Sequence, residues 1–86
     1  MSKVEIYTTP TCPFCHAAKA LMHEKGVDFE EITVLDPNLR AKMIDRANGR
    51  RTVPQIFIGA THLGGYDDVA AMDRRGQLDP LLRAEG

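Results

Sequence analysis

The first part of the chain changes from a strand-like to a helix-like pattern of apolar side chains. Residues 4–9 alternate and are rich in β-branched side chains, which predicts a strand that Pro10 ends. Apolar residues then recur at helical spacing, as on one face of an amphipathic helix: Phe14, Ala17, Ala18, Leu21 and Met22. This helix is expected to begin near Cys12 and Pro13 and to end at Gly26, a residue suited to the position after a helix.

A second strand and a second helix follow. Residues 29–34 have the composition of a strand. Asp36 then offers a helix N-cap, and Pro37 suits the first helical position. This helix carries an apolar stripe of Leu39, Met43, Ile44 and Ala47, and residues 48–49 (Asn-Gly) end it. Because a helix connects the two early strands, we expect them to be parallel.

The last third of the chain predicts a hairpin followed by helix. Two short apolar strands, residues 55–58 and 61–63, flank a Gly-Ala turn and should pair in antiparallel fashion. Gly64 and Gly65 break the second strand, and Asp67 is expected to cap a helix that includes Val69 and Met72. A second cap-plus-proline signal, Asp79-Pro80, precedes Leu81-Leu82. The order β-α-β-α-β-β-α predicts an α/β fold with a four-stranded mixed sheet flanked by helices.

Length, composition and charge narrow the class of protein. A chain of 86 residues allows one domain, residues 1–86, and 43% hydrophobic with 27% charged residues argues against disorder. The 11 basic and 12 acidic residues leave a net charge of −1, which speaks against nucleic acid or an anionic membrane as a partner. With no membrane-spanning run and no signal-peptide apolar region, we expect a cytoplasmic protein, and we expect it to be monomeric.

Two cysteines three residues apart, at a predicted helix start, carry the candidate chemistry. Cys12 and Cys15 lie on one side of the first turn, so a disulfide between them is geometrically possible. Cys12 is placed where free backbone N–H groups and the helix dipole stabilise a thiolate and lower its pKa. Cys15 lies one turn inside and should be less exposed, with a higher pKa. Cys12 is therefore expected to attack a disulfide and Cys15 to resolve the mixed disulfide.

Three other uses of this cysteine pair are open at this point. A structural zinc site needs four ligands, and the histidines at 16, 23 and 62 lack finger-like spacing. The run from Cys12 to His16 matches the c-type haem attachment pattern, which would require export and a haem-sized pocket. The two cysteines could also be inert and buried. The absence of an export signal and the β-α-β order favour a redox-active dithiol with no metal and no permanently bound cofactor.

Three segments of the chain together resemble the glutaredoxins, a family of the thioredoxin-like superfamily. They are Thr11-Cys12-Pro13-Phe14-Cys15 after the first strand, Thr52-Val53-Pro54 before the third, and Gly64-Gly65-Tyr66-Asp67-Asp68 after the hairpin. The resemblance covers nearly the whole chain and is closest to the small dithiol class. It implies a thioredoxin-like fold and the glutathione-dependent reduction of protein disulfides and of glutathione mixed disulfides.

The resemblance also implies which residues form the site. Cys12 and Cys15 would be catalytic, and the glutathione-binding residues would be Phe14, Arg51, Thr52, Val53, Pro54, Gly65, Tyr66 and Asp67. Val53 would pair its backbone with the cysteinyl part of glutathione like an added strand, beside a cis Pro54. Phe14 would lie beside the glutathione sulfur. Backbone N–H groups near Tyr66 and Asp67, with the Asp67 carboxylate, would hold the γ-glutamyl end.

Several charged positions have two interpretations. Many glutaredoxins carry a lysine three residues before the first cysteine, where this chain has Thr9, so Arg40 or Arg51 would have to replace its charge. Arg51 and its neighbours Arg46 and Arg50 either form a solvated basic face or attract the glutathione carboxylates. Asp67 is either a helix cap or a glutathione ligand, and it can be both. His16 is expected to face solvent.

Two rival functions use the same cysteines. An electron donor served by thioredoxin reductase would need no glutathione site, and segments 52–54 and 64–67 count against it. In an iron–sulfur carrier, two chains would share a cluster through Cys12 and two glutathiones, and Pro13 counts against that function. The expected partners are therefore glutathione as co-substrate and proteins that are glutathionylated or carry disulfides.

Overall fold

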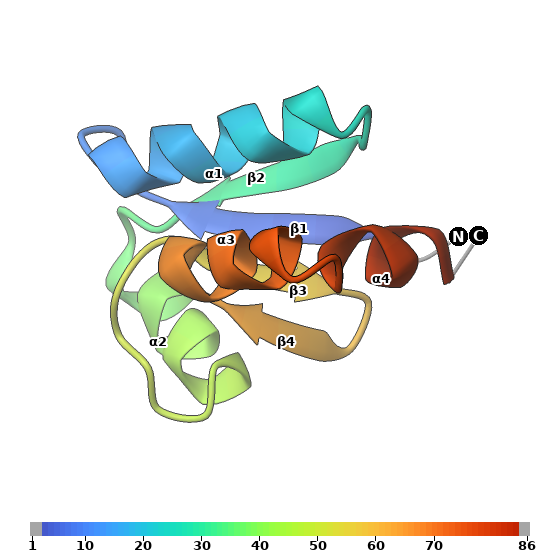
Figure 1. Ribbon diagram of the computed structural model, residues 1–86. Coiled ribbons are helices and arrows are strands. Elements are labelled where there is room, and N and C mark those ends of the chain that lie inside the picture. Colours follow the sequence, from blue (N-terminus) through green and yellow to red (C-terminus); the bar gives the residue numbers. More distant parts are fainter. Residues whose placement is uncertain (1–2, 85–86) are drawn as a thin grey trace.

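The strands and helices follow one another in the predicted order (Figure 1). The computed structural model describes residues 3–84. Their elements are β1 (Val4–Thr8), α1 (Pro13–Glu24), β2 (Phe29–Thr33), α2 (Pro37–Arg46), β3 (Gln55–Ile58), β4 (Thr61–Gly64), α3 (Tyr66–Arg74) and α4 (Leu78–Ala84). The helical region after the hairpin is divided into α3 and α4.

The break between these two helices differs in detail from the prediction. Gly76 has a φ of +72°, a left-handed conformation that glycine adopts without strain, and it follows the end of α3. The backbone N–H of Gln77 closes this turn on the carbonyl of Met72, at 2.8 Å. Helix α4 already begins at Leu78, so Asp79 lies in its first turn instead of preceding it. Complete burial of Leu78 in the core explains this earlier start.

The sheet has the strand order β2-β1-β3-β4. β1 and β2 are parallel, with Val4 opposite Phe29, as the helical crossover predicted. β1 pairs with β3, and β3 with β4, in antiparallel fashion, which confirms the predicted hairpin. Because β1 and β3 are antiparallel, the carboxyl end of β1, which leads into α1, lies beside the amino end of β3. The candidate site lies at these strand ends.

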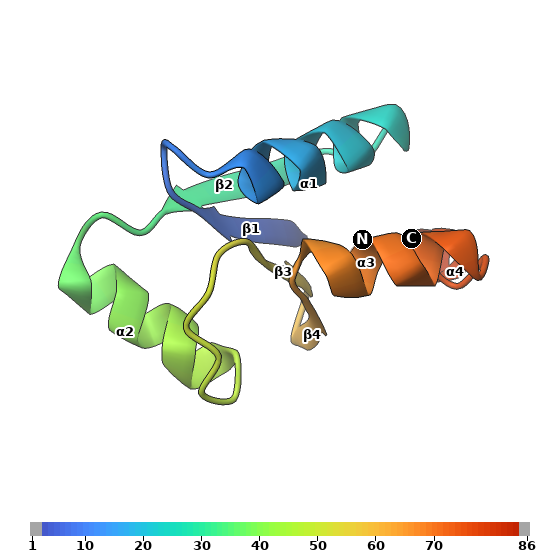
Figure 2. The same cartoon turned by 60° about the vertical axis from the view of Figure 1, so that its left-hand side comes forward.

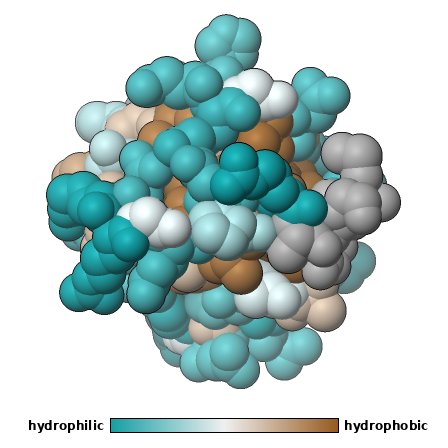
Figure 3. All heavy atoms as spheres, turned by 45° about the vertical axis from the view of Figure 1, so that its right-hand side comes forward, coloured by the Kyte–Doolittle hydropathy of each residue, from teal (hydrophilic) through white to brown (hydrophobic). Residues whose placement is uncertain are grey.

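Helices cover both faces of the sheet (Figures 1 and 2). One face buries Val4, Ile6 and Ile56 against apolar side chains of α1, α3 and α4. The other buries Tyr7 and Phe57 against α2. This division follows from the alternation of side chains along each strand. On the face shown in Figure 3, hydrophilic residues cover most of the surface, and hydrophobic residues show mainly in the gaps between them.

Candidate active site

Cys12 is the N-cap residue of α1, in an extended conformation that directs its sulfur toward the first turn of the helix. The sulfur accepts a hydrogen bond from the backbone N–H of Cys15, with 3.1 Å between nitrogen and Sγ. Pro13 occupies the first helical position, where its missing N–H leaves no donor unsatisfied. The Cys12 sulfur therefore lies at the N-terminal end of the helix, in contact with a backbone N–H donor of its first turn.

Cys15 lies in a different environment from Cys12. Its side chain has no exposed surface, whereas Cys12 is 9% exposed at the start of the helix. Burial is the main cause that raises the pKa of the Cys15 thiol to about 12, and a hydrogen bond with Cys12 acts in the same direction. Both cysteines are free thiols. At neutral pH Cys15 is therefore a protonated, buried thiol, one helical turn away from the slightly more exposed Cys12.

The loop before β3 brings a distant backbone segment to Cys12. The Val53–Pro54 peptide bond is cis, as the family resemblance implied. The Cys12 thiol donates a long hydrogen bond to the carbonyl oxygen of Val53, with 3.7 Å between sulfur and oxygen. Pro54 is buried and Val53 half-buried, so this part of the loop is fixed against the protein. A peptide lying along Val53 would thus lie next to the reactive sulfur.

A cavity of about 260 Å³ extends beside this loop. Seven of the residues that the resemblance implied for glutathione line it: Phe14, Thr52, Val53, Pro54, Gly65, Tyr66 and Asp67. The rings of Phe14 and Tyr66 are stacked, with centroids 6.2 Å apart, and form an apolar wall. A Cβ atom at Gly65 would lie 3.4 Å from the Pro54 carbonyl oxygen, an ordinary van der Waals contact, so the approach of the loop does not itself require glycine at this position.

Arg50 and Asp68 also line the cavity. Sequence reasoning named Arg50 only as a member of the basic cluster, with Arg51 as the candidate ligand-binding residue, and it did not select Asp68. Arg51, which it did select, is exposed and is not among the lining residues in the described part of the chain; its carbonyl accepts a hydrogen bond from Arg40. Position 9, where many glutaredoxins carry a lysine, is threonine in this chain. Among the residues that line the cavity, Arg50 supplies a positive charge. Arg50 and Arg51 are neighbours in a loop, and the sequence pattern does not predict which of the two side chains points into the cavity.

The expectation that Arg46 belongs to a solvated basic face is wrong. Its guanidinium lies over the ring of Phe57, at 4.1 Å from the centroid, and donates a hydrogen bond to the Tyr7 hydroxyl. It also pairs with Glu5, at 3.0 Å. Arg46 is in the last turn of α2, which packs on the sheet, so its aliphatic stem and its cation stabilise that contact. His16, in contrast, is exposed as predicted.

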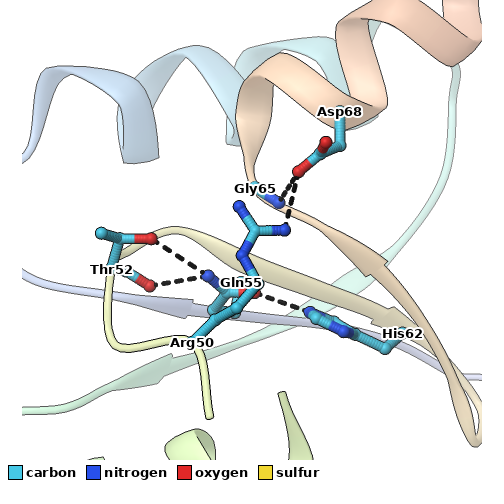
Figure 4. Close-up of polar contacts among 6 residues, drawn as sticks. All are labelled: Arg50, Thr52, Gln55, His62, Gly65 and Asp68. Carbon is cyan, nitrogen blue, oxygen red and sulfur yellow. Dashed lines mark hydrogen bonds and ion pairs between the residues drawn. The ribbon is translucent and has the colours of Figure 1, made fainter. Parts of the chain in front are cut away.

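The start of α3 also differs from the prediction. The helix begins at Tyr66 after Gly65 as N-cap, so Asp67 lies in the first turn and is not the capping residue. Asp68 takes that role, because its Oδ2 accepts the Gly65 N–H at 2.9 Å (Figure 4). The same oxygen pairs with Arg50 Nη1 at 2.8 Å. The hydrogen bond from Arg50 and that from Gly65 hold the pKa of Asp68 below its usual value.

Replacing Asp68 with alanine is expected to destabilise the fold by about 1 kcal/mol at pH 7, mainly through loss of the Gly65 N–H acceptor. The exposed ion pair with Arg50 adds little. Because the folded-state pKa of Asp68 is lowered, this stabilisation is complete above the unfolded value of about 4 and is lost as the pH falls through the folded value. Urea unfolding at pH 7 and pH 3 measures it, with Asp67→Ala as the matched control. Equal losses for both variants would contradict this assignment.

The other uses of the cysteine pair can be compared with this geometry. Within residues 3–84, no three side chains of histidine, cysteine, aspartate or glutamate come together in an arrangement that could hold a metal ion. In the same range, no helix is both long and apolar enough to cross a membrane. Two cysteines of unequal exposure, near a cavity that Val53 lines, suit the exchange of disulfides with a ligand that binds alongside Val53.

Comparisons with known proteins agree on one family. A family model described as Glutaredoxin matches residues 4–63. The chain is 59% identical to Glutaredoxin 3 of Escherichia coli strain K12 over 85 residues, which cover 96% of this chain and 100% of that protein. It is similar to the solution structure of a Brucella melitensis glutaredoxin, with a TM-score of 0.86 and 50% identity over 100% of this chain and 94% of the other. A buckwheat glutaredoxin–glutathione complex gives a TM-score of 0.87 at 29% identity, covering 96% and 78% respectively.

Proposed function

The chain belongs to the glutaredoxin family, and from this membership we propose that Cys12 is the nucleophile and Cys15 the resolving thiol of its active site. The protein is a glutathione-dependent thiol–disulfide oxidoreductase. One observation carries the division of roles: the Cys12 sulfur accepts the Cys15 N–H at the start of α1, while the Cys15 side chain is fully buried. The greater exposure of Cys12 supports its role as the sulfur that meets the substrate disulfide.

With a glutathionylated protein, one thiol suffices. The Cys12 thiolate attacks the glutathione sulfur, the substrate's S–S bond breaks, and the protein leaves as a thiolate that takes up a proton. Cys12 then carries glutathione in a mixed disulfide. A second glutathione thiolate attacks the sulfur of the bound glutathione, which releases oxidised glutathione and restores the Cys12 thiolate. The net exchange consumes one free glutathione, whose thiol sulfur is oxidised into the new disulfide, while the substrate cysteine is reduced to a thiol and its former glutathione leaves in oxidised glutathione.

With a protein disulfide, both cysteines take part. Cys12 attacks one sulfur and forms a mixed disulfide with the substrate. Cys15 loses its proton, attacks the Cys12 sulfur, and expels the second substrate thiolate, leaving a disulfide between Cys12 and Cys15. Two glutathione molecules then reduce this disulfide in succession and leave as oxidised glutathione. The separation by three residues on the first helical turn supports this intramolecular step.

Glutathione is proposed to lie in the cavity beside Val53. Its cysteinyl backbone would pair with Val53 as an added strand, which places its sulfur beside Cys12. The N-terminus of α3 and the carboxylate of Asp67 would hold the carboxylate and the ammonium of its γ-glutamyl end. Arg50 would attract a glutathione carboxylate, and Arg51, on the rim, would add long-range attraction. The buckwheat complex supports a glutathione site on this fold.

Exchanging Asp67 for asparagine is expected to raise the KM for a glutathionylated peptide about fivefold and to leave kcat nearly unchanged. The amide has no charge to attract the ammonium of the γ-glutamyl group, and the loss corresponds to roughly 1 kcal/mol of binding. Asp73→Asn is the matched control, because Asp73 lies in the last turn of the same helix and pairs with Lys25. Steady-state kinetics of both variants decide the matter. Equal KM values for Asp67→Asn and Asp73→Asn would remove Asp67 from the proposed site.

The function is tested by NADPH consumption with a small mixed disulfide as substrate. The reaction is supplied first with glutathione and glutathione reductase, and then with thioredoxin reductase alone. Turnover only in the first mixture is expected. Turnover only in the second would leave the cysteine roles in place and discard the glutathione site.

The proposal also includes a compartment, an oligomeric state and the partners of the protein. We place the protein in the cytoplasm, where glutathione keeps thiols reduced, and we propose that it acts as a monomer formed by one domain, residues 1–86. Its partners would be glutathionylated proteins and proteins with reducible disulfides. Glutathione would serve as a co-substrate, with no cofactor bound between turnovers.

A further inference from the structure

A buried amide connects the core of the sheet to the loop beside Cys12. Gln55 is the first residue of β3, and its side chain is completely buried, which is unusual for a glutamine. Its Nε2 donates to the carbonyl oxygen of Thr52, at 2.9 Å, and to the hydroxyl oxygen of Thr52, at 3.2 Å. Its Oε1 lies 2.6 Å from Nε2 of His62 on the neighbouring strand β4 (Figure 4).

These contacts fix the orientation of the amide. A carbonyl oxygen can only accept, so the nitrogen of the Gln55 side chain must face Thr52 and its oxygen must face His62. His62 therefore donates from Nε2, and its imidazole is held in that position by stacking on Phe57, with centroids 4.8 Å apart. Burial, followed by the charge of Arg50, lowers the pKa of His62 from its usual value, which favours the neutral ring.

The position of Thr52 matters because Thr52 directly precedes Val53, whose carbonyl oxygen faces the Cys12 sulfur. Arg50, Arg51 and Thr52 are exposed, and Val53 is half-buried. Thr52 and Val53 both line the cavity, and the Val53 carbonyl accepts the long hydrogen bond from the Cys12 thiol. A shift of Thr52 would consequently move the backbone of Val53 relative to the Cys12 sulfur.

We propose that Gln55, oriented by His62, is a positioning residue that holds Thr52 and thereby sets the backbone edge of Val53 for the ligand of the cavity. The proposal rests on the proposed function, in which glutathione pairs with Val53. Gln55 itself touches neither the reacting sulfurs nor the cavity. Its effect should therefore depend on whether the substrate carries the peptide backbone of glutathione, and a purely structural role would show no such dependence.

The test uses single-turnover kinetics of the pre-reduced protein with one peptide in two forms. In the first form the peptide's cysteine carries glutathione, and in the second it carries mercaptoethanol, which has no backbone to pair with Val53. Gln55→Met, which keeps the length and fills the buried space without a donor, is expected to lower the rate with the glutathionylated peptide about tenfold. The rate with the mercaptoethanol form should change less than twofold.

Two controls separate positioning from damage to the fold. Leu78→Ala removes a fully buried side chain from α4 and should lower stability without changing the ratio of the two rates. His62→Ala should lower the rate with the glutathionylated peptide about threefold, whereas His62→Gln, whose amide can donate to Gln55, should restore most of it. These two variants provide the test even if Gln55→Met does not fold.

The experiment distinguishes failure of the positioning role of Gln55 from failure of the proposed function. A wild-type protein that does not prefer the glutathionylated peptide would overturn the proposed function. A wild-type preference that survives unchanged in Gln55→Met, or an equal loss with both peptides, would overturn the positioning role alone. With the His62 variants alone, a wild-type rate for His62→Ala, or a rate for His62→Gln as low as that of His62→Ala, would do the same.

Discussion

Replacing Cys12 with serine is expected to abolish turnover with every disulfide substrate, to below roughly one thousandth of the wild-type rate. A serine hydroxyl at the start of α1 would keep the hydrogen bond from the Cys15 N–H, but it does not ionise near neutral pH and cannot form a disulfide. Cys15 cannot take over, because its side chain is fully buried and its pKa is raised to about 12. The variant should fold normally, since serine is close to cysteine in size.

Alkylation by iodoacetamide measures this prediction independently of turnover. At pH 7 the wild-type protein should take up one equivalent, and Cys12→Ser should take up none although it retains Cys15. Denaturation in urea should expose Cys15 and restore one equivalent in the variant, which serves as the internal control. Substantial activity in Cys12→Ser, or rapid alkylation of Cys15 in the folded protein, would show that the nucleophile has been assigned to the wrong cysteine.

The helical and strand periods predicted most of the fold because they report local burial. Residues of β1 are buried on both faces of the sheet, and the helical spacing places Ala18 and Met22 in the core, whereas Phe14, at the start of that stripe, is exposed. Pro13 and Gly26 mark helix ends that depend on backbone geometry. The start of α4 at Leu78 was missed because burial of that side chain outweighs the local cap signal at Asp79.

The composition of the site was predictable where a motif fixes the backbone, and less so where long-range contacts choose among neighbours. Arg50 lines the cavity instead of Arg51 because it reaches Asp68, which is 18 residues away in the chain. Asp68 caps α3 instead of Asp67 because the helix starts at Tyr66, two positions earlier than an N-cap at Asp67 would require. The buried link from Gln55 to His62 joins two strands, and no local pattern indicates it.

Replacing Cys15 with serine is expected to separate the two activities. Reduction of a protein disulfide should fall by about a hundredfold or more, because the mixed disulfide on Cys12 can then be released only by an external thiol instead of by a neighbour held at high effective concentration. Removal of glutathione from glutathionylated peptides should stay within a few fold of wild type, since that route uses the Cys12 sulfur and a second glutathione. The Cys15 side chain is buried and does not line the cavity, so the cavity should be unchanged.

Mass spectrometry after acid quenching tests the trapped intermediate directly. With a protein disulfide as substrate, Cys15→Ser should accumulate a covalent adduct of the mass of the substrate, whereas the wild type should show only the internal disulfide. Cys15→Ala is the matched control, because it removes the thiol without burying a hydroxyl that needs a hydrogen-bond partner. If both variants lost the glutathione-removing activity as completely as Cys12→Ser, Cys15 would have to act before the mixed disulfide forms. Its burial and its pKa of about 12 argue that it acts afterwards, when an acceptor sulfur is already bound one helical turn away on Cys12.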